Sequence, residues 1–203
     1  RKGEAQHIVE LTPTILRKAC EDFPMDLPEN VSIIHAYCVI VKPKAFPVDV
    51  YLGGATADTM CITVITESGL LASIISSRHS EAHDALQNTM EKVLKHKFEP
   101  CTVFLSPSLR IYDRPSECFG ELIAKHGEIA KKYIKPSKKE GGLTINYAGF
   151  IKELLTNFPA ATVFDSGLDS AKMKAMSSAS MHHKNSGDGY GGTSRNTMIS
   201  GKI

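Results

Sequence analysis

Five lysines crowded into nine residues are the strongest electrostatic feature of this sequence: Lys131, Lys132, Lys135, Lys138 and Lys139. Lysine attracts phosphate as a point charge, without the paired hydrogen bonds by which arginine reads a base. The run therefore predicts an anion patch that contacts nucleic-acid phosphates, or an anionic membrane surface, independently of sequence. The alternative is a solvated helix end, because cations there complement the helix dipole. A second basic group would extend the patch if the two helix ends met: Lys92, Lys95, His96 and Lys97.

A second group with chemical potential is His79, Glu81 and His83, where a strand gives way to a helix. Two histidines four residues apart on a helix can share a metal ion. A helix that is capped by Ser80 leaves His79 outside it, however, and no third ligand has a recognisable spacing. The pair His182-His183 near the end of the chain is equally isolated. We predict a solvated surface cluster and no metal site.

Nucleophilic and cofactor motifs are weak. Cys118 lies in the first turns of an expected helix, where a thiolate is favoured, but Glu117 and Glu121 flank it and oppose that charge. Residues 187–192 match GxGxxG, yet neither the strand that should precede this motif nor the helix that should follow it is evident. There is also no GxSxG elbow and no GxxxxGK[ST] loop. We predict no catalytic residue, no cofactor and no enzymatic activity.

The elements that must position these groups follow from hydrophobic periodicity. Four apolar runs predict strands at 31–42, 48–52, 60–66 and 70–76, the last two joined by a hairpin turn at residues 67–69. Short strands are expected at 101–105 and 161–164. A 3.6-residue period predicts helices at 13–23, at 80–96, from about 113 to Pro136 and at 145–157, with a basic loop at 136–142.

The order of these elements indicates one α+β domain over residues 1–165. We expect a four-stranded antiparallel β meander at about 31–76, with helices packed on one face and a short helix before it. From about Ser166 the chain is rich in Ser, Gly, Met and His, so residues 166–203 are predicted to be a polar tail that acts as an interaction arm.

Composition restricts the location of the protein. The five cysteines are odd in number and none is spaced as CxxC. Four of them lie in apolar segments, as buried free thiols do in a reducing compartment. We predict an intracellular, cytoplasmic protein, with the nucleus as the alternative. No window approaches the roughly 18 apolar residues of a membrane helix, and a net charge of +2 does not by itself indicate nucleic-acid binding.

These observations favour a non-catalytic assembly or scaffold protein, such as a small viral matrix- or capsid-associated structural protein. It would form homo-oligomers, or dock on a protein partner, through its tail. The first alternative is a sequence-independent nucleic-acid-binding (RNA-binding) or anionic-surface-binding protein that uses the lysine run at 131–139. The second alternative is an enzyme without a recognisable local motif.

Overall fold

The computed structural model describes residues 6–12, 14, 36–42, 59–138 and 140–172. Several features singled out above lie outside the described residues: the helix expected at 13–23 apart from residue 14, the strand at 48–52, Lys139, the His182-His183 pair, and the GxGxxG match at 187–192. Their predictions remain untested.

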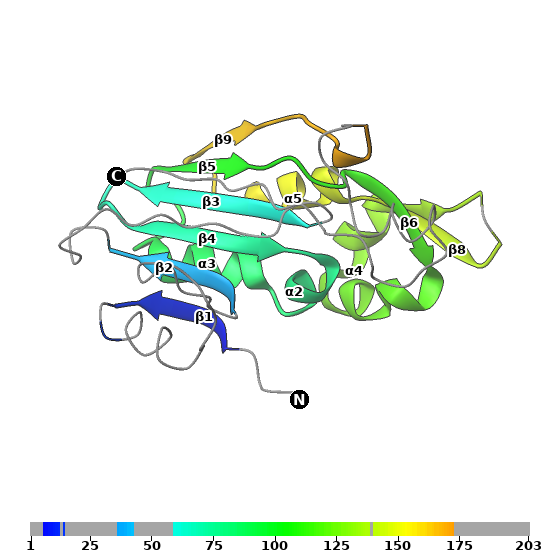
Figure 1. Cartoon of the computed structure of the whole chain (residues 1–203), viewed down its shortest axis with the longest axis horizontal. Coiled ribbons are helices and arrows are strands. Elements are labelled where there is room, and N and C mark those ends of the chain that lie inside the picture. The colour runs from blue at the N-terminus through cyan, green and yellow to red at the C-terminus, as the bar shows by residue number, and fades with distance from the viewer. Residues whose placement is uncertain (1–5, 13, 15–35, 43–58, 139, 173–203) are drawn as a thin grey trace, which may run out of the picture.

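The larger of two sheets has six strands in the order β1-β2-β4-β3-β5-β9 (Figure 1). Strands β1 and β2 pair in parallel, as do β5 and β9, while the pairs between β2, β4, β3 and β5 are antiparallel. The sheet is therefore mixed. Its strands are β1 (Gln6–Leu11), β2 (Ala36–Val41), β3 (Met60–Thr66), β4 (Leu71–Ser76), β5 (Cys101–Leu105) and β9 (Ala161–Asp165).

The predicted four-stranded antiparallel meander is thus wrong as an architecture, although strands form within three of its expected ranges, as β2, β3 and β4, and the fourth range lies outside the described residues. The hairpin of β3 and β4 is confirmed, because Gly69 takes the left-handed backbone that its turn requires (φ 81°). The predicted meander did not include the two edge strands of the sheet, β1 and β9. Strand β1 pairs with β2 in parallel, and β9 with β5, and each pair joins segments that are far apart in the sequence, so no local turn signal announces it.

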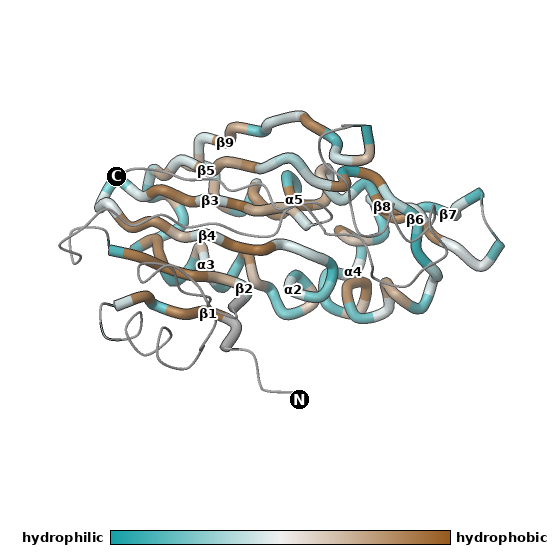
Figure 2. Tube along the Cα trace, in the orientation of Figure 1, coloured by the Kyte–Doolittle hydropathy of each residue, from teal (hydrophilic) through white to brown (hydrophobic). Residues whose placement is uncertain are grey.

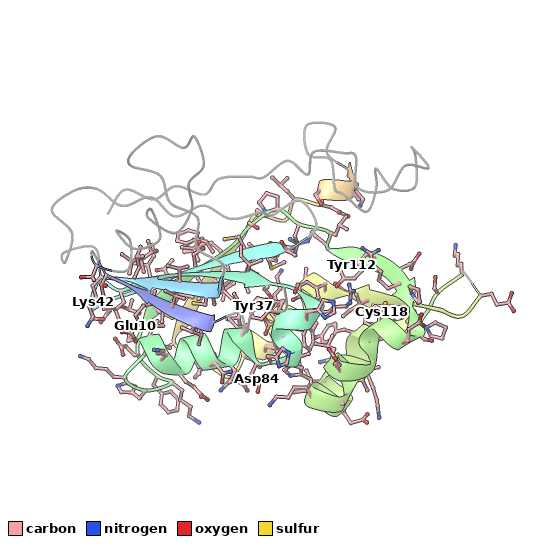
Figure 3. The ribbon with its side chains drawn as sticks, turned by 60° about the horizontal axis from the view of Figure 1, so that its bottom comes forward. Glu10, Tyr37, Lys42, Asp84, Tyr112 and Cys118 are labelled. Atoms are coloured by element: carbon pink, nitrogen blue, oxygen red, sulfur yellow. The ribbon has the colours of Figure 1, made fainter. Side chains whose placement is uncertain are left out.

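The described residues form four α-helices: α2 (Arg78–Ala82), α3 (Ala85–Val93), α4 (Gly120–Tyr133) and α5 (Tyr147–Leu155). Helices α2, α3 and α5 lie along one face of the large sheet, and α4 lies past its end, beside the second sheet (Figures 1 and 3). The single helix expected at 80–96 is split, because Asp84 adopts a left-handed backbone (φ 55°) between α2 and α3. Its first turn is capped by Ser77 rather than Ser80, and the two serines form a reciprocal capping box.

A second, three-stranded antiparallel sheet lies beyond one end of the first, in the order β6-β8-β7 (Figure 1). It consists of β6 (Ile111–Pro115), β8 (Gly142–Asn146) and β7 (Ile134–Pro136). The expected loop at 136–142 is therefore the turn of a hairpin, in which Gly141 has a φ of 68°. The expected helix start near Asp113 is a strand, and a 3₁₀ turn, η2 (Ser116–Phe119), leads into α4.

The core fills the space between the large sheet and the helices, and the apolar colouring of Figure 2 follows the central strands. Ile62, Val64 and Ile74 point inward and meet Leu86 and other helix residues that are equally buried. Free thiols are buried at Cys38, Cys61 and Cys101, as expected, and Cys118 is half-buried. Among the described helices, none is long and apolar enough to cross a membrane.

The start of the expected tail folds back onto the domain. Ser166 donates its backbone N–H to the carbonyl of Leu105, and Ser170 is buried beside Ser108. A second 3₁₀ turn, η3 (Ser170–Lys172), ends the described part of the chain. The division at residue 165, the partner-binding role of the tail, and the cytoplasmic or nuclear location stay predictions.

Candidate functional site

One end of the large sheet gathers polar groups from distant parts of the sequence. Strands β4, β5 and β9 all run toward this end, where the second sheet and the start of α5 also lie (Figure 1). Arg110 lies between β5 and β6, and Asp165 is the last residue of β9. Because parallel strands present their carboxyl ends at one edge, these two residues are brought together there.

The guanidinium group of Arg110 grips the Asp165 carboxylate with two hydrogen bonds, Nη1 to Oδ1 at 2.8 Å and Nη2 to Oδ2 at 2.5 Å. Lys152 of α5 adds an ion pair of 2.6 Å to Oδ2, and the Gly167 N–H donates to Oδ1. Partial burial raises the pKa of Asp165, but the hydrogen bonds from Arg110 and Lys152 outweigh it and hold that pKa well below its usual range. Asp165 is therefore an anion at neutral pH that fixes two cations in place.

These cations face an open groove of about 360 Å³, referred to here as the Arg110 groove. Its walls are Arg110, Ile111, Asn146, Ala148, Gly149, Lys152, Gly167, Asp169 and Lys172. Three cations stand against the carboxylates of Asp165 and Asp169, which leaves one net positive charge. The start of α5 also lines the groove and adds the partial positive charge of a helix N-terminus. The groove is therefore suited to a small anion.

The first N–H groups of α5 are already engaged. Those of Tyr147 and Ala148 donate to the carbonyl of Arg110 at 2.8 and 3.3 Å, and that of Gly149 donates to the Asn146 side chain at 3.0 Å. Consequently α5 contributes its dipole to the groove, while direct hydrogen bonds to a ligand would come from Arg110 and the lysines.

A buried chain of hydrogen bonds links Tyr147, at the start of α5, to the end of β4 and to α2. The hydroxyl of Ser76 donates to Glu81 Oε1 at 2.8 Å and lies 2.8 Å from the hydroxyl of Tyr147, so Tyr147 is the donor to Ser76. The other carboxyl oxygen of Glu81 accepts from the N–H of Leu86 at 3.2 Å. Ser76 and Glu81 are wholly buried. Burial raises the pKa of Glu81 to about 7 despite these hydrogen bonds, and it also raises that of Tyr147.

The structure does not bring together the histidine cluster considered in the sequence. His79 is exposed and lies 3.9 Å from Glu121, and His83 caps the exposed end of α2. Glu81 points the opposite way, into the core. Within the described ranges, no three His, Cys, Asp or Glu side chains converge as metal ligands do.

The lysine run is exposed at the end of α4 and along β7. Lys131 pairs with Glu128 at 2.7 Å, and Lys132 pairs with Glu153 at 2.9 Å. Lys135 and Lys138 are exposed. The second basic group does not join them, because α3 ends at the opposite end of the molecule from β7 (Figures 1 and 2). Anion binding by the run stays a prediction.

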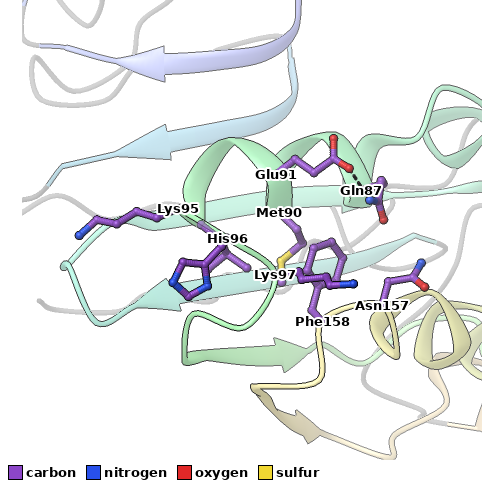
Figure 4. A pocket seen from close by; sticks show the side chains of 9 residues that line it. Gln87, Met90, Glu91, Lys95, His96, Lys97, Asn157 and Phe158 are labelled. Atoms are coloured by element: carbon purple, nitrogen blue, oxygen red, sulfur yellow. Dashed lines mark hydrogen bonds between the residues drawn. The ribbon is translucent and has the colours of Figure 1, made fainter.

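A larger groove, of about 520 Å³, lies at that opposite end between the end of α3 and Phe158 (Figure 4). Lys95 and Lys97 line it, but so does Glu91, whose carboxylate holds the Gln87 amide. The buried carboxylate of Glu99 accepts from the Lys95 N–H. This groove has more volume than the Arg110 groove, but among the described residues no carboxylate is paired with Lys95 or Lys97 as Asp165 is paired with Arg110 and Lys152.

Sequence reasoning missed every residue of the Arg110 groove. Arg110 and Asp165 are 55 residues apart, and Lys152 is the one cation of a mostly apolar helix, beside Glu153. No spacing rule connects them. The sequence contained a weak indication that Glu81 is buried, because it lies between an apolar strand and the apolar face of the helix that follows.

No family model matches this sequence, and no curated protein sequence matches it. Solved bacterial structures do share its fold. Bacillus licheniformis hypothetical protein YfiH aligns with a TM-score of 0.64 at 11% identity, over 86% of this chain and 64% of its own. YlmD from Geobacillus stearothermophilus gives 0.59 at 12% identity, over 85% and 63%. Neisseria meningitidis protein NMB0706, described as DUF152, gives 0.54 at 12% identity, over 68% and 56%.

The chain spans less than two thirds of each of these neighbours. The matches nevertheless overturn the predicted function: the chain has the fold of these bacterial proteins, and the prediction of a viral matrix- or capsid-associated scaffold protein is wrong. They equally contradict the prediction that the chain is not an enzyme. That prediction relied on absent local motifs, and a site assembled from distant residues leaves none. The scaffold function is not retained, and nucleic-acid binding by the lysine run is untested.

Proposed function

We propose that this chain is an enzyme that acts on a small molecule carrying a phosphate, held in the Arg110 groove. One observation carries the proposal: Arg110 and Lys152 are fixed by Asp165 at the carboxyl ends of two parallel strands, beside the start of α5. This edge of a sheet is where α/β proteins commonly bind their ligands. The fold shared with the longer bacterial chains supports the same assignment.

The chemistry of the groove suits phosphate. A guanidinium group has about five N–H donors, of which Asp165 occupies two. The remaining donors of Arg110 form a fork that matches two phosphate oxygens, and Lys152 and Lys172 add point charges. Asp169, which lines the groove, is the carboxylate placed to accept a proton from a water molecule or a substrate hydroxyl beside the bound anion.

Titration calorimetry with inorganic phosphate tests the binding step. We expect Lys152→Met and Lys172→Met each to weaken phosphate binding about fivefold, as the loss of one charge–charge contact does. Lys92→Met is the matched control, because Lys92 lies on α3, pairs with Glu10 of β1 and does not line the groove. Equal binding by all four proteins would reject the groove as an anion site.

Catalysis needs its own measurement. ³¹P NMR of the full chain with a panel of phosphate monoesters, with and without inorganic phosphate, should reveal turnover of at least one compound. Asp169→Asn should abolish that turnover while retaining phosphate binding. If phosphate binds but no compound turns over, the groove is a binding site and the enzyme assignment fails.

A further inference from the structure

We propose that Glu81 is a positioning residue for the Arg110 groove, and that its protonation controls the groove's affinity for an anion through Ser76 and Tyr147. The proposal rests on the assignment of the groove as an anion site. It adds a means of regulation: a buried carboxylic acid that never touches the ligand makes binding dependent on pH.

Tyr147 connects the two places. It is the first residue of α5, and its backbone N–H donates to the carbonyl of Arg110. Its side chain runs inward and donates to Ser76, which donates to Glu81. Its chain neighbours, Asn146 and Ala148, both line the groove. A shift of the Tyr147 ring is therefore felt at the groove wall.

Glu81 is anchored on its other sides. Its second carboxyl oxygen accepts from the Leu86 N–H, and its backbone carbonyl lies 2.7 Å from Nε2 of His126. When Glu81 loses its proton, the change in hydrogen-bond strength falls on Ser76 and Tyr147, because the helix side of the carboxyl group is already held. Ionisation also places a negative charge at the inner end of the hydrogen-bond chain whose outer end, Tyr147, lies between two residues that line the groove. Both effects weaken anion binding as the pH rises.

The charged groups around Glu81 are few. Asp84 follows it on the α2–α3 link and pairs with Lys125 of α4, and His126 lies 3.7 Å from the same carboxylate. On the α5 side stands Tyr147, with the ring of Tyr112 6.0 Å from it. Burial is the largest cause of the raised Glu81 pKa, and the charge of Asp84 adds to it. Glu81→Gln leaves Asp84, Lys125 and His126 in place, so it changes the buried carboxyl group alone.

Amide NMR of the ligand-free chain tests the coupling without any anion. The Gly149 N–H at the groove should show a chemical-shift inflection near pH 7, the pKa of Glu81. Glu81→Gln should remove this inflection. Ser76→Ala keeps the Glu81 carboxyl group but removes the hydroxyl that links it to Tyr147. The Gly149 N–H chemical shift should therefore again show no inflection. Glu67→Gln, an exposed carboxylate in the β3–β4 turn, is the matched control and should leave the inflection unchanged.

Sulfate is the binding probe, because it does not titrate in this range. Calorimetry should show sulfate affinity falling about threefold or more from pH 6 to pH 8 in the native chain, and a much smaller change in Glu81→Gln.

Sulfate binding whose pH dependence survives Glu81→Gln, together with a Gly149 inflection that also survives it, would overturn the positioning role while leaving the anion site intact. Absence of sulfate binding in every variant would instead reject the groove assignment itself, and the Gly149 titration would still report whether the buried chain is coupled to α5.

Discussion

The hydroxyl of Ser76 donates a 2.8 Å hydrogen bond to the carboxyl group of Glu81, and both side chains are wholly buried. Ionising a carboxyl group in such a place is unfavourable, and the hydrogen bonds from Ser76 and the Leu86 N–H do not offset the loss of water. The pair therefore makes the stability of the fold depend on pH, apart from any effect on the groove.

The first prediction concerns that dependence. Glu81 has a folded-state pKa of about 7 against an ordinary value of 4.5. Above pH 4.5 the unfolded chain releases this proton while the folded chain still holds it, so stability falls as the pH rises toward 7 and levels off beyond it. The full change is about 3 kcal/mol. Urea unfolding of the native chain and Glu81→Gln at several pH values measures it.

In Glu81→Gln the fall in the free energy of unfolding between pH 4.5 and pH 7 should disappear. The variant should therefore become more stable relative to the native chain as the pH rises. Glu67→Gln should keep the native profile. Parallel stability curves for the native chain and Glu81→Gln would show that the buried carboxyl group does not titrate between these values.

The second prediction concerns Tyr147. Tyr147→Phe removes one buried donor and leaves the Ser76 oxygen with an unfilled acceptor site, which should cost about 1–2 kcal/mol. Tyr133→Phe is the comparison: the Tyr133 hydroxyl donates to Glu153 near the surface, where water can replace it, so the loss should be smaller. Chemical denaturation measures the free energy of unfolding of both variants. An equal decrease in the two would mean that the buried hydrogen bond of Tyr147 stabilises the fold no more than the surface one of Tyr133.

The third prediction concerns the middle of α4. Gly127 has φ 50° and ψ −123°, a conformation that interrupts the helix and that side chains strongly disfavour. Gly127→Ala should destabilise the fold by about 1–2 kcal/mol.

Gly120→Ala is the matched control for Gly127→Ala. Gly120 has ordinary helical angles and an added Cβ there meets nothing, so alanine should be neutral or stabilising. The melting temperature should fall in Gly127→Ala and stay the same or rise in Gly120→Ala. An equal fall in both variants would contradict the backbone argument.

The fourth prediction concerns Asp165. Its pKa is lowered in the folded state by Arg110 and Lys152, so its stabilising effect is complete above the ordinary value of 3.8 and is lost as the pH falls below it. Asp165→Asn should cost about 2 kcal/mol at neutral pH, because two cations lose their anion. Acid unfolding followed by circular dichroism should show the two proteins converging below about pH 4. A constant difference down to low pH would point to a packing defect instead.

Local elements were accessible from the sequence because each is set by neighbouring residues. The β3–β4 hairpin needed only two apolar runs and Gly69 between them, and α5 needed an apolar face and the break that follows it. The apolar strand at 161–164 was recognised, as β9, for the same reason.

Tertiary structure decided the rest. Residues 6–11 show no clear strand pattern, and they form β1 because β2 offers them an edge. The helix expected at 80–96 breaks at Asp84, where Lys125 and His126 of a distant helix hold the carboxylate.

The candidate site belongs wholly to this second category. Arg110, Lys152 and Asp165 are ordinary charged residues in the sequence, and they become a site only when parallel pairing of β5 and β9 carries them to one edge. The sequence alone determined which segments are apolar and where the β3–β4 hairpin and α5 form, since those properties depend on neighbours within a few residues. Which side chains meet was determined by burial of the whole core, which acts between residues that the sequence separates.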